Sequence, residues 1–295
     1  MRELIHQTIQ RFEAAGISSP EINARMIWAH VMGLETWELT LRKQEPDEDQ
    51  RKIAESLISA REKRIPLQHL LGSVGFCGLQ LDVCSEVLIP RPETELLVET
   101  ALKIAQEMDH ADLRCLDMAT GSGCIALSLA EALPESTIVG VDLSNDALKW
   151  AKHNAEKNRL SNRVNWVCSD LWESLTPGQE KWDIVTCNPP YIATHEIQTL
   201  EPEVRDHDPV LALDGGVDGL DFYRRIASEA VPFMRPAGKL ILECGMGQAS
   251  SIIQIFISAS WFANEIIQDY NKTARIIVFS PLKYRISSII SFSVS

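Results

Sequence analysis

The sequence predicts an α/β fold: a doubly wound, mostly parallel sheet with a small helical amino-terminal domain and a linking β-hairpin. Three observations support this prediction. From residue 113 onward, short apolar runs alternate with segments of helical period, which is typical of a mostly parallel sheet covered on both faces. Residues 1–72 show the helical period alone. Between these regions, Gly72, Gly75 and Gly78 separate short extended runs, as in a hairpin.

The amino-terminal region is expected to form several helices. Ser19-Pro20 predicts one helix start, with Ser19 as the N-cap and Pro20 at the first helical position. Glu45-Pro46-Asp47 predicts another start. The side chains expected to face inward are apolar and recur at helical spacing: Ile5, Ile9, Phe12, Ile22, Met26, Ile27, Ile53, Leu57 and Ile58. We therefore expect a helical domain at residues 1–72, a hairpin linker at 73–90, and a sheet domain at 91–295.

The linker contains two extended runs, Leu79–Val83 and Val87–Ile89, which we expect in the hairpin. Within the sheet domain, strands are expected at Arg114–Met118, Thr137–Val141, Val164–Val167, Asp183–Cys187, Lys239–Cys244 and Arg275–Phe279. Helices are expected at Glu93–Gln106, Cys124–Ala132, Asn145–Asn158 and Leu220–Val231. The Ser- and Ile-rich stretch Ile286–Ser295 is left unassigned.

Composition narrows the class of protein. Hydrophobic residues make up 45% of the chain, enough for a buried core, and no apolar run reaches the ~18 residues of a membrane span. The amino terminus lacks the apolar centre of a secretion signal. The seven cysteines include no CxxC pair, which disfavours a disulfide scaffold or a metal site and favours free thiols in the cytoplasm. A net charge of -13 argues against nucleic acid as a partner. We expect a cytoplasmic monomer with no metal, no membrane contact and no direct nucleic-acid contact.

A glycine-rich loop follows the first predicted strand of the sheet domain. It reads Asp117-Met118-Ala119-Thr120-Gly121-Ser122-Gly123 and opens a helix, so its backbone can approach a ligand closely. Asp142 ends the next strand, where a carboxylate can hold ribose hydroxyls; a helix cap is the alternative interpretation. Gly121, Gly123 and Ala126 also fit a dinucleotide fingerprint, so the loop leaves nucleoside and dinucleotide open. Asp117 favours the nucleoside, because its carboxylate repels a pyrophosphate and suits a cationic methionine moiety.

A third acid, Asp170, follows the strand that ends near Val167. From that position its carboxylate can accept a hydrogen bond from an adenine amino group. A helix N-cap is the alternative interpretation of this residue.

Asn188-Pro189-Pro190-Tyr191 ends the strand that we expect beside the first one. A planar amide or amino nitrogen is a poor nucleophile, because its lone pair is delocalised. The side-chain oxygen of Asn188 and the carbonyl of Pro189 can accept its two N–H groups and aim that lone pair at a methyl donor. Tyr191 offers a flat wall, and the proline rings make the turn rigid. A purely structural strand-ending turn is the alternative.

Six segments together resemble the HemK/PrmC family, whose members methylate the glutamine of the Gly-Gly-Gln loop in peptide chain release factors. The resemblance runs from the helical region to about residue 280. The segments are Pro66–Gly72, Val87–Glu95, Asp117–Gly123, Asn188–Ile192, Pro209–Gly216 and Gly219-Leu220. It implies a class I, Rossmann-like methyltransferase fold, S-adenosyl-L-methionine as cofactor, release factors as the protein substrate, and a substrate-recognition role for residues 1–72.

The resemblance also implies the site residues. The cofactor would be surrounded by Asp117, Ala119, Thr120, Gly121, Ser122, Gly123, Asp142, Asp170, Leu171, Trp172 and Asn188. The glutamine would be held by Asn188, Pro189, Pro190 and Tyr191, with Arg91 and Glu93 lining the site; Asn188, Pro189 and Tyr191 would be catalytic. A domain-joining ion pair or a helix cap is the alternative interpretation of Arg91 and Glu93. The family often has Gly in place of Ala119, which would matter if that position needs positive φ. The residues after Lys283 match no family pattern.

Other functions remain open at this point. A sister family methylates a glutamine of a ribosomal protein, but has Pro-Arg-Ser-Pro where this chain has Pro90-Arg91-Pro92-Glu93. A nucleic-acid amino methyltransferase would need a basic face and a base-flipping pocket. A dehydrogenase would leave Asn188–Tyr191 unexplained, and intact Asn188 and Asp142 count against a catalytically silent binding module.

Overall fold

The structure, a computed structural model, describes residues 1–41, 45–108, 110–178 and 181–282. The chain divides into two compact units. One consists of Met1–Ser73 and Leu200–His207, and the other of Val74–Thr199 and Asp208–Ser295. None of the helices in the described ranges combines the length and apolar character that crossing a membrane requires. The unassigned stretch 286–295 lies outside the described residues.

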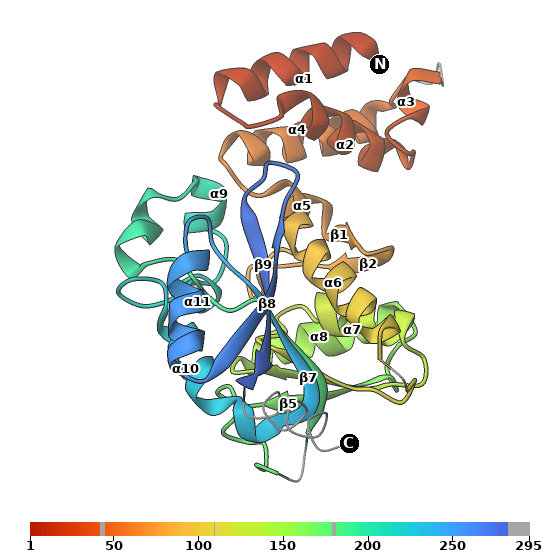
Figure 1. The fold of residues 1–295 in the computed structure, drawn as a ribbon. Coiled ribbons are helices and arrows are strands. Elements are labelled where there is room, and N and C mark those ends of the chain that lie inside the picture. Colours follow the sequence, from red (N-terminus) through yellow and green to blue (C-terminus); the bar gives the residue numbers. More distant parts are fainter. Residues whose placement is uncertain (42–44, 109, 179–180, 283–295) are drawn as a thin grey trace, which may run out of the picture. The chain divides into compact units, whose positions relative to one another are not determined.

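The first unit is helical. It contains α1 (Arg2–Ala14), α2 (Pro20–Met32), α3 (Glu38–Leu41), α4 (Glu48–Glu62), α5 (Leu67–Leu71) and α9 (Pro202–Arg205). The helices α1, α2 and α4 pack on one another (Figure 1). Phe12, Ile27 and Ile58 are buried between them. The prediction of a small helical amino-terminal region is confirmed.

The predicted start of α4 is confirmed, whereas that of α2 is confirmed only in position. Asp47 caps α4 and forms a reciprocal capping box with Gln50, which satisfies two free backbone N–H groups. Helix α2 begins at Pro20 as predicted, but Ser19 has a φ of 50° and its side chain makes no cap hydrogen bond. The inward positions of Ile22 and Ile53 were also wrong, because these side chains are 58% and 54% exposed.

The segment 200–207 belongs to the helical unit, where two arginines of that unit bind it. Arg61, which is 4% exposed, donates to Glu203 at 2.8 Å and to Asn23 at 2.8 Å. Arg64 donates to both oxygens of Glu203, at 2.8 and 2.7 Å. Burial by itself raises the pKa of Glu203, but the hydrogen bonds from Arg64 and Arg61 outweigh it and lower the pKa to about 2. Helix α9 is therefore held by a well-paired carboxylate.

The second unit is built on a seven-stranded sheet of order β5-β4-β3-β6-β7-β9-β8. Its strands are β3 (Arg114–Met118), β4 (Thr137–Asp142), β5 (Val164–Cys168), β6 (Trp182–Cys187), β7 (Met234–Glu243), β8 (Trp261–Gln268) and β9 (Ala274–Pro281). The pairs from β5 to β7 are parallel, while β9 runs antiparallel to β7 and β8. The predicted doubly wound, mostly parallel sheet is confirmed.

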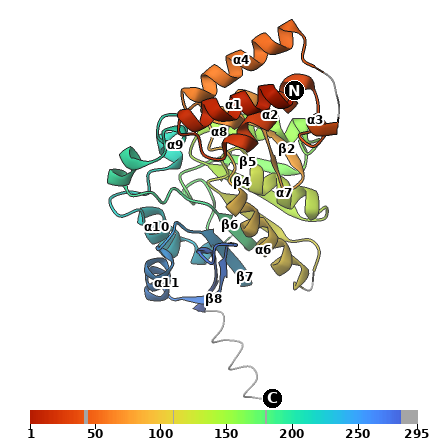
Figure 2. The ribbon, with the colours of Figure 1, turned by 90° about the horizontal axis from the view of Figure 1, so that it is seen from above.

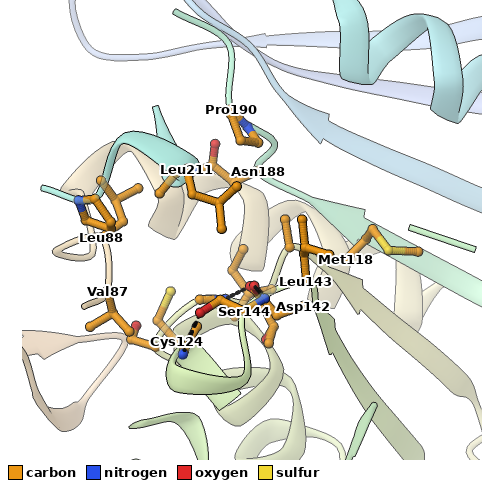
Figure 3. A pocket seen from close by; sticks show the side chains of 18 of the residues that line it. Val87, Leu88, Met118, Cys124, Asp142, Leu143, Ser144, Asn188, Pro190 and Leu211 are labelled. Carbon is orange, nitrogen blue, oxygen red and sulfur yellow. Dashed lines mark hydrogen bonds between the residues drawn. The ribbon is translucent and has the colours of Figure 1, made fainter. Parts of the chain in front are cut away.

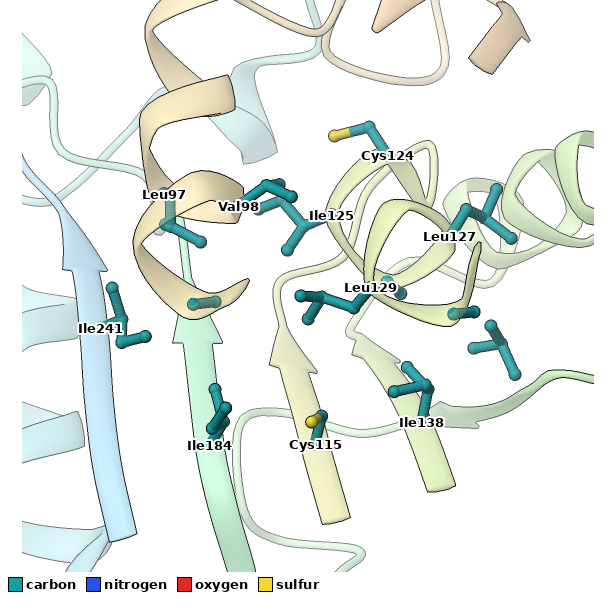
Figure 4. Packing of buried hydrophobic residues seen from close by; sticks show 14 of the residues in the cluster. Leu97, Val98, Cys115, Cys124, Ile125, Leu127, Leu129, Ile138, Ile184 and Ile241 are labelled. Carbon is teal, nitrogen blue, oxygen red and sulfur yellow. The ribbon is translucent and has the colours of Figure 1, made fainter. Parts of the chain in front are cut away.

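Helices cover both faces of this sheet. One face is packed by α6 (Glu95–Gln106), α7 (Cys124–Ala132) and α8 (Asn145–Lys157), and the other by α10 (Asp221–Glu229) and α11 (Ala249–Ser258). Figures 1 and 2 both show α6 and α7 on the opposite side from α10 and α11. Successive strand residues alternate between the layers: Ile184 packs under α6 and α7 (Figure 4), and Val185 packs on the other face. Short 3-10 turns lie at Pro92–Thr94, Thr194–Thr199, Val210–Ala212 and Val231–Phe233.

The predicted hairpin is present but shorter than expected. It pairs β1 (Ser73–Phe76) with β2 (Leu79–Asp82), whereas Val87–Ile89 forms no strand. Asn154 of α8, which is fully buried, binds the backbone N–H and carbonyl of Asp82 and the carbonyl of Ser122. One side chain thus links the hairpin to the glycine-rich loop. Helix α11 and strand β8 were not predicted.

Candidate active site

The site lies where the winding of the sheet reverses. Strands β3 and β6 are neighbours, and the chain leaves them toward opposite edges of the sheet, so the loops at their carboxyl ends leave a crevice. The pocket there holds about 1030 Å³ of empty space, counting the part open to solvent. In Figure 3, Asn188 and Pro190 lie on one side of it, and Asp142 and Ser144 lie on the other.

Ten of the predicted site residues line this pocket: Arg91, Ala119, Thr120, Gly121, Ser122, Asp142, Asp170, Leu171, Asn188 and Pro190. Most of the apolar wall of the pocket was not predicted; it includes Val87, Leu88, Met118, Leu143, Leu211 and Phe222. The signal for two of these was present, because Val87 and Leu88 were recognised as apolar but assigned to a strand. No cluster of metal-binding side chains occurs in the part of the chain that the structure describes.

The glycine-rich loop is held by the acid at the end of β4. Asp142 accepts hydrogen bonds from the N–H of Gly121 and the N–H of Ser144, both at 2.8 Å. Burial raises the pKa of Asp142, and the backbone hydrogen bonds oppose that rise. Each carboxylate oxygen has a second lone pair, so the same group can fix the loop and accept ligand hydroxyls. Ser144, rather than Asp142, caps α8.

Asp117 occupies a different place from the other acids. It is fully buried and does not line the pocket. Its oxygens accept hydrogen bonds from Thr120 at 2.5 Å and from Thr186 at 2.9 Å. Burial raises the pKa of Asp117 to about 7, against the effect of these two hydroxyls. Asp117 therefore supports the loop from below.

The loop after β5 contributes only part of what was predicted from it. Asp170 and Leu171 line the pocket, and Asp170 also accepts a hydrogen bond from Arg225 at 2.8 Å. Trp172 is buried in the core, where its ring stacks on Phe233 at 4.7 Å between ring centres. A bond from Asp170 to adenine stays a prediction.

The Asn-Pro-Pro-Tyr turn at the end of β6 is tightly enclosed. Asn188 donates from Nδ2 to the Thr94 hydroxyl at 3.2 Å. Gln248 donates to the carbonyl of Tyr191 at 2.8 Å and accepts from the N–H of Gly245 at 3.0 Å. A Cβ added at Gly219 would lie 2.4 Å from the Tyr191 oxygen. Only a glycine fits so close, which accounts physically for the Gly219-Leu220 pattern.

The predicted residues Pro189, Tyr191, Gly123 and Glu93 adjoin the pocket in sequence without lining it. Tyr191 is largely buried, and burial raises its pKa to about 12, so it remains a neutral phenol. Arg91 donates to Asp208 at 2.5 Å. Asp208 is 5% exposed, so this pair ties the segment before α6 to the segment that carries Leu211.

A doubly wound sheet, a glycine-rich loop backed by an acid, and an Asn-Pro-Pro-Tyr turn together define a class I methyltransferase. The comparisons specify the family. Residues 3–72 match the family described as the PrmC N-terminal domain, and residues 75–207 match the methyltransferase small domain.

Several curated relatives carry the name release factor glutamine methyltransferase, and two of them show the extent of the match. The protein from Geobacter sulfurreducens is 37% identical over 94% of this chain and 95% of its own length. The protein from Deinococcus radiodurans is 38% identical over 89% of this chain and 92% of its own length. The chain therefore belongs to the release factor glutamine methyltransferase family, and the dehydrogenase interpretation is wrong.

Among solved structures, the chain is similar to the hMettl16 catalytic domain in complex with MAT2A 3'UTR hairpin 6. The TM-score is 0.53 and the identity 18%, over 79% of this chain and 82% of the other. At that identity the likeness concerns the fold alone.

Proposed function

We propose that this chain acts in the cytoplasm, where it transfers a methyl group from S-adenosyl-L-methionine to the side-chain nitrogen N5 of the glutamine in the Gly-Gly-Gln segment of peptide chain release factors. It would thereby modify a factor of translation termination. The observation that carries this proposal is the position of Asn188. This residue follows β6 at the switch point of the sheet and lines the same pocket as Asp142.

The pocket residues fit S-adenosyl-L-methionine. The backbone at Gly121 can approach the ligand closely, Asp142 keeps lone pairs for ribose hydroxyls, and Met118 and Leu143 offer apolar surface to the adenine. When bound, the cofactor supplies an electrophilic methyl group on a positively charged sulfur.

The chain's own residues then have to orient the glutamine amide. Asn188 Oδ1 and the Pro189 carbonyl are proposed to accept the two N–H groups of the amide. That arrangement favours a pyramidal nitrogen with its lone pair directed at the methyl group. The product nitrogen can release its proton after transfer, so no strong general base is required.

The substrate is proposed from the names of the curated relatives, and the helical unit is proposed to recognise it. The test is to incubate the protein with labelled cofactor and purified release factor, ribosomal proteins or RNA, and to locate the label by mass spectrometry. We expect label on the Gly-Gly-Gln glutamine. Label on RNA or a ribosomal protein, with none on that glutamine, would refute the assignment.

Replacing the proposed acceptor tests the mechanism. Asn188→Ala is expected to lower kcat by about 10²–10³-fold, the loss typical of one preorganised transition-state contact, while cofactor binding falls much less. Asn162→Ala, at an exposed position, is the control and should leave kcat unchanged. Full activity of Asn188→Ala would show that the oxygen of Asn188 does not hold the amide.

A further inference from the structure

Beside Asn188 lies a buried carboxyl group that does not line the pocket and that the proposed mechanism does not use. Glu243 is the last residue of β7 and is 2% exposed. Strands β6 and β7 are parallel neighbours, with Cys187 opposite Leu242. The next residues along, Asn188 and Glu243, therefore lie side by side. Asn188 lines the pocket and Glu243 does not.

Thr94 completes this group from the start of α6. Asn188 Nδ2 donates to the Thr94 hydroxyl at 3.2 Å, and both side chains act to lower the pKa of the neighbouring Glu243 carboxyl. Three side chains from separate elements thus form one polar network. Glu243 comes from β7, Asn188 from the turn after β6, and Thr94 is the N-cap of α6. Arg275 and Glu93 are the charged groups that also face this carboxyl.

Stabilisation of the fold does not explain why the Glu243 carboxyl is buried. Its Oε2 is buried without a hydrogen-bond partner among the described residues, and an incompletely paired buried carboxylate costs free energy. Burial raises the pKa of Glu243 to about 7, although Thr94, Arg275 and Asn188 act to lower it. Strained or perturbed groups of this kind concentrate at functional sites.

The network determines which way the Asn188 amide points. An asparagine side chain has two N–H donors on one side and one acceptor oxygen on the other. Because Nδ2 of Asn188 donates to Thr94, Oδ1 is directed away from the Thr94 hydroxyl. In the flipped amide, Oδ1 would face a carboxylate, and the NH₂ group would face the N–H groups of an incoming glutamine. Both contacts are repulsive.

We propose that Glu243, acting with Thr94, is a positioning residue for methyl transfer: it holds the Asn188 amide with its oxygen toward the substrate nitrogen. The Glu243 carboxylate also places negative charge behind that oxygen as positive charge develops on the methylated nitrogen. In a water-poor site such preorganised charge stabilises the transition state more than the ground state.

The test compares Glu243→Gln and Thr94→Val with Thr100→Val. Thr100 is the matched control, because it lies in α6, the helix that begins directly after Thr94, is 7% exposed and donates to the Leu96 carbonyl. We expect kcat to fall about 10–100-fold in Glu243→Gln and about 10-fold in Thr94→Val, less than for a direct contact. The cofactor Kd, measured by calorimetry, and the KM of the protein substrate should change less than about threefold. Thr94→Ser should restore kcat.

Two further readouts separate positioning from a structural role. In the Asn188→Ala background, adding Glu243→Gln should change kcat less than about twofold, since residues that act through one another are not additive. In the wild type, kcat should rise with pH near neutrality as the buried carboxyl ionises, and Glu243→Gln should lack that rise. An unchanged kcat in Glu243→Gln, or a loss of cofactor binding that parallels the loss of kcat, would overturn the proposal.

This inference rests on the proposed function, but the two can fail separately. The assay uses whichever acceptor the wild type labels. If the wild type labels RNA or a ribosomal protein, the substrate assignment fails while the positioning role is still measured on that acceptor. If the wild type labels the release factor and Glu243→Gln is as fast, only the positioning role fails.

Discussion

Two residues of the pocket have a backbone conformation that side chains disfavour. Ala119 has a φ of 57° and Leu171 a φ of 48°, and both line the pocket. The left-handed region costs a residue with a Cβ about 1–2 kcal/mol. Such strain persists only where neighbouring contacts enforce it, and it clusters at ligand sites. The loops after β3 and β5 therefore owe their shape to the fold around them.

The strain at Ala119 leads to a stability prediction. Ala119→Gly should raise the free energy of unfolding by about 0.5–1 kcal/mol, because relief of the left-handed strain exceeds the entropy that glycine adds to the unfolded chain. Thermal unfolding measures it. Ala126→Gly, a buried position inside α7, is the control and should lower stability by about 1 kcal/mol or more. A destabilised Ala119→Gly would mean that the loop is not strained in solution.

At the scale of single residues, the sequence indicated which residue types form the site, but not which of them line the pocket and which are buried beneath it. The strain at Ala119 was foreseen conditionally, because it depends on one dihedral angle. Asp117 and Trp172 were assigned to the ligand, yet the structure buries both away from the pocket. Their burial depends on Thr186 and Phe233, which are distant in sequence. Glu243 and Thr94 went unnoticed for the same reason: their contacts with Asn188 exist only in the folded sheet.

Among elements, the turn after β6 is defined by the segment that packs against it. The N–H of Ile192 donates to the Leu213 carbonyl, and the N–H of Gly215 donates to the Ile192 carbonyl. Gly215 and Gly219 lie against the backbone of Pro190 and Tyr191, where a Cβ would meet backbone atoms at 2.9 Å or less. The conformation of the turn is therefore fixed both by its prolines and by the glycines that pack against it.

Crowding at Gly219 predicts a loss of activity. Gly219→Ala would place a Cβ 2.4 Å from the Tyr191 oxygen at a φ of 73°, so the turn must shift. A shift of about 1 Å can cost about 10²-fold in rate, and kcat should fall at least 10-fold. Gly178→Ala is the matched control, because its φ is 81° and nothing lies within 4 Å of the added atom. It should lose stability but keep its kcat, and equal losses in both variants would contradict the role of crowding.

The elements that were predicted are those whose sequence pattern is locally determined. Strand β3 and helix α7 have the predicted bounds, because a buried strand and a buried helix leave strong apolar patterns. Strand β8 was missed because it is an edge strand with a mostly exposed, irregular burial pattern. Val87–Ile89 was assigned to a strand because an apolar run that lines a pocket resembles one that pairs in a sheet.

On the scale of the whole molecule, one segment late in the sequence folds with the amino-terminal helices. The segment 200–207 lies between the Asn-Pro-Pro-Tyr turn and Asp208 in sequence, yet it belongs to the helical unit. From the sequence, the chain was divided near residues 72 and 90, where composition and period change. The return of a later segment could not be predicted, since that depends on Arg61 and Arg64 meeting Glu203.

The Glu203 carboxylate makes the stability of the folded state depend on pH. Its folded pKa, about 2, lies below the ~4.3 of an unfolded chain. The pairing therefore stabilises the folded state above pH ~4.3, on the order of 2–3 kcal/mol, and this contribution is lost as pH falls toward 2. Glu203→Gln should weaken amide-exchange protection in α4 at pH 7, and the difference from wild type should shrink on acidification. Glu201→Gln is the control: Glu201 binds the same Arg64 but is 76% exposed, so its loss should cost less than about 1 kcal/mol. A Glu203→Gln effect that stays constant from pH 7 to pH 3 would show that its charge does not hold α9.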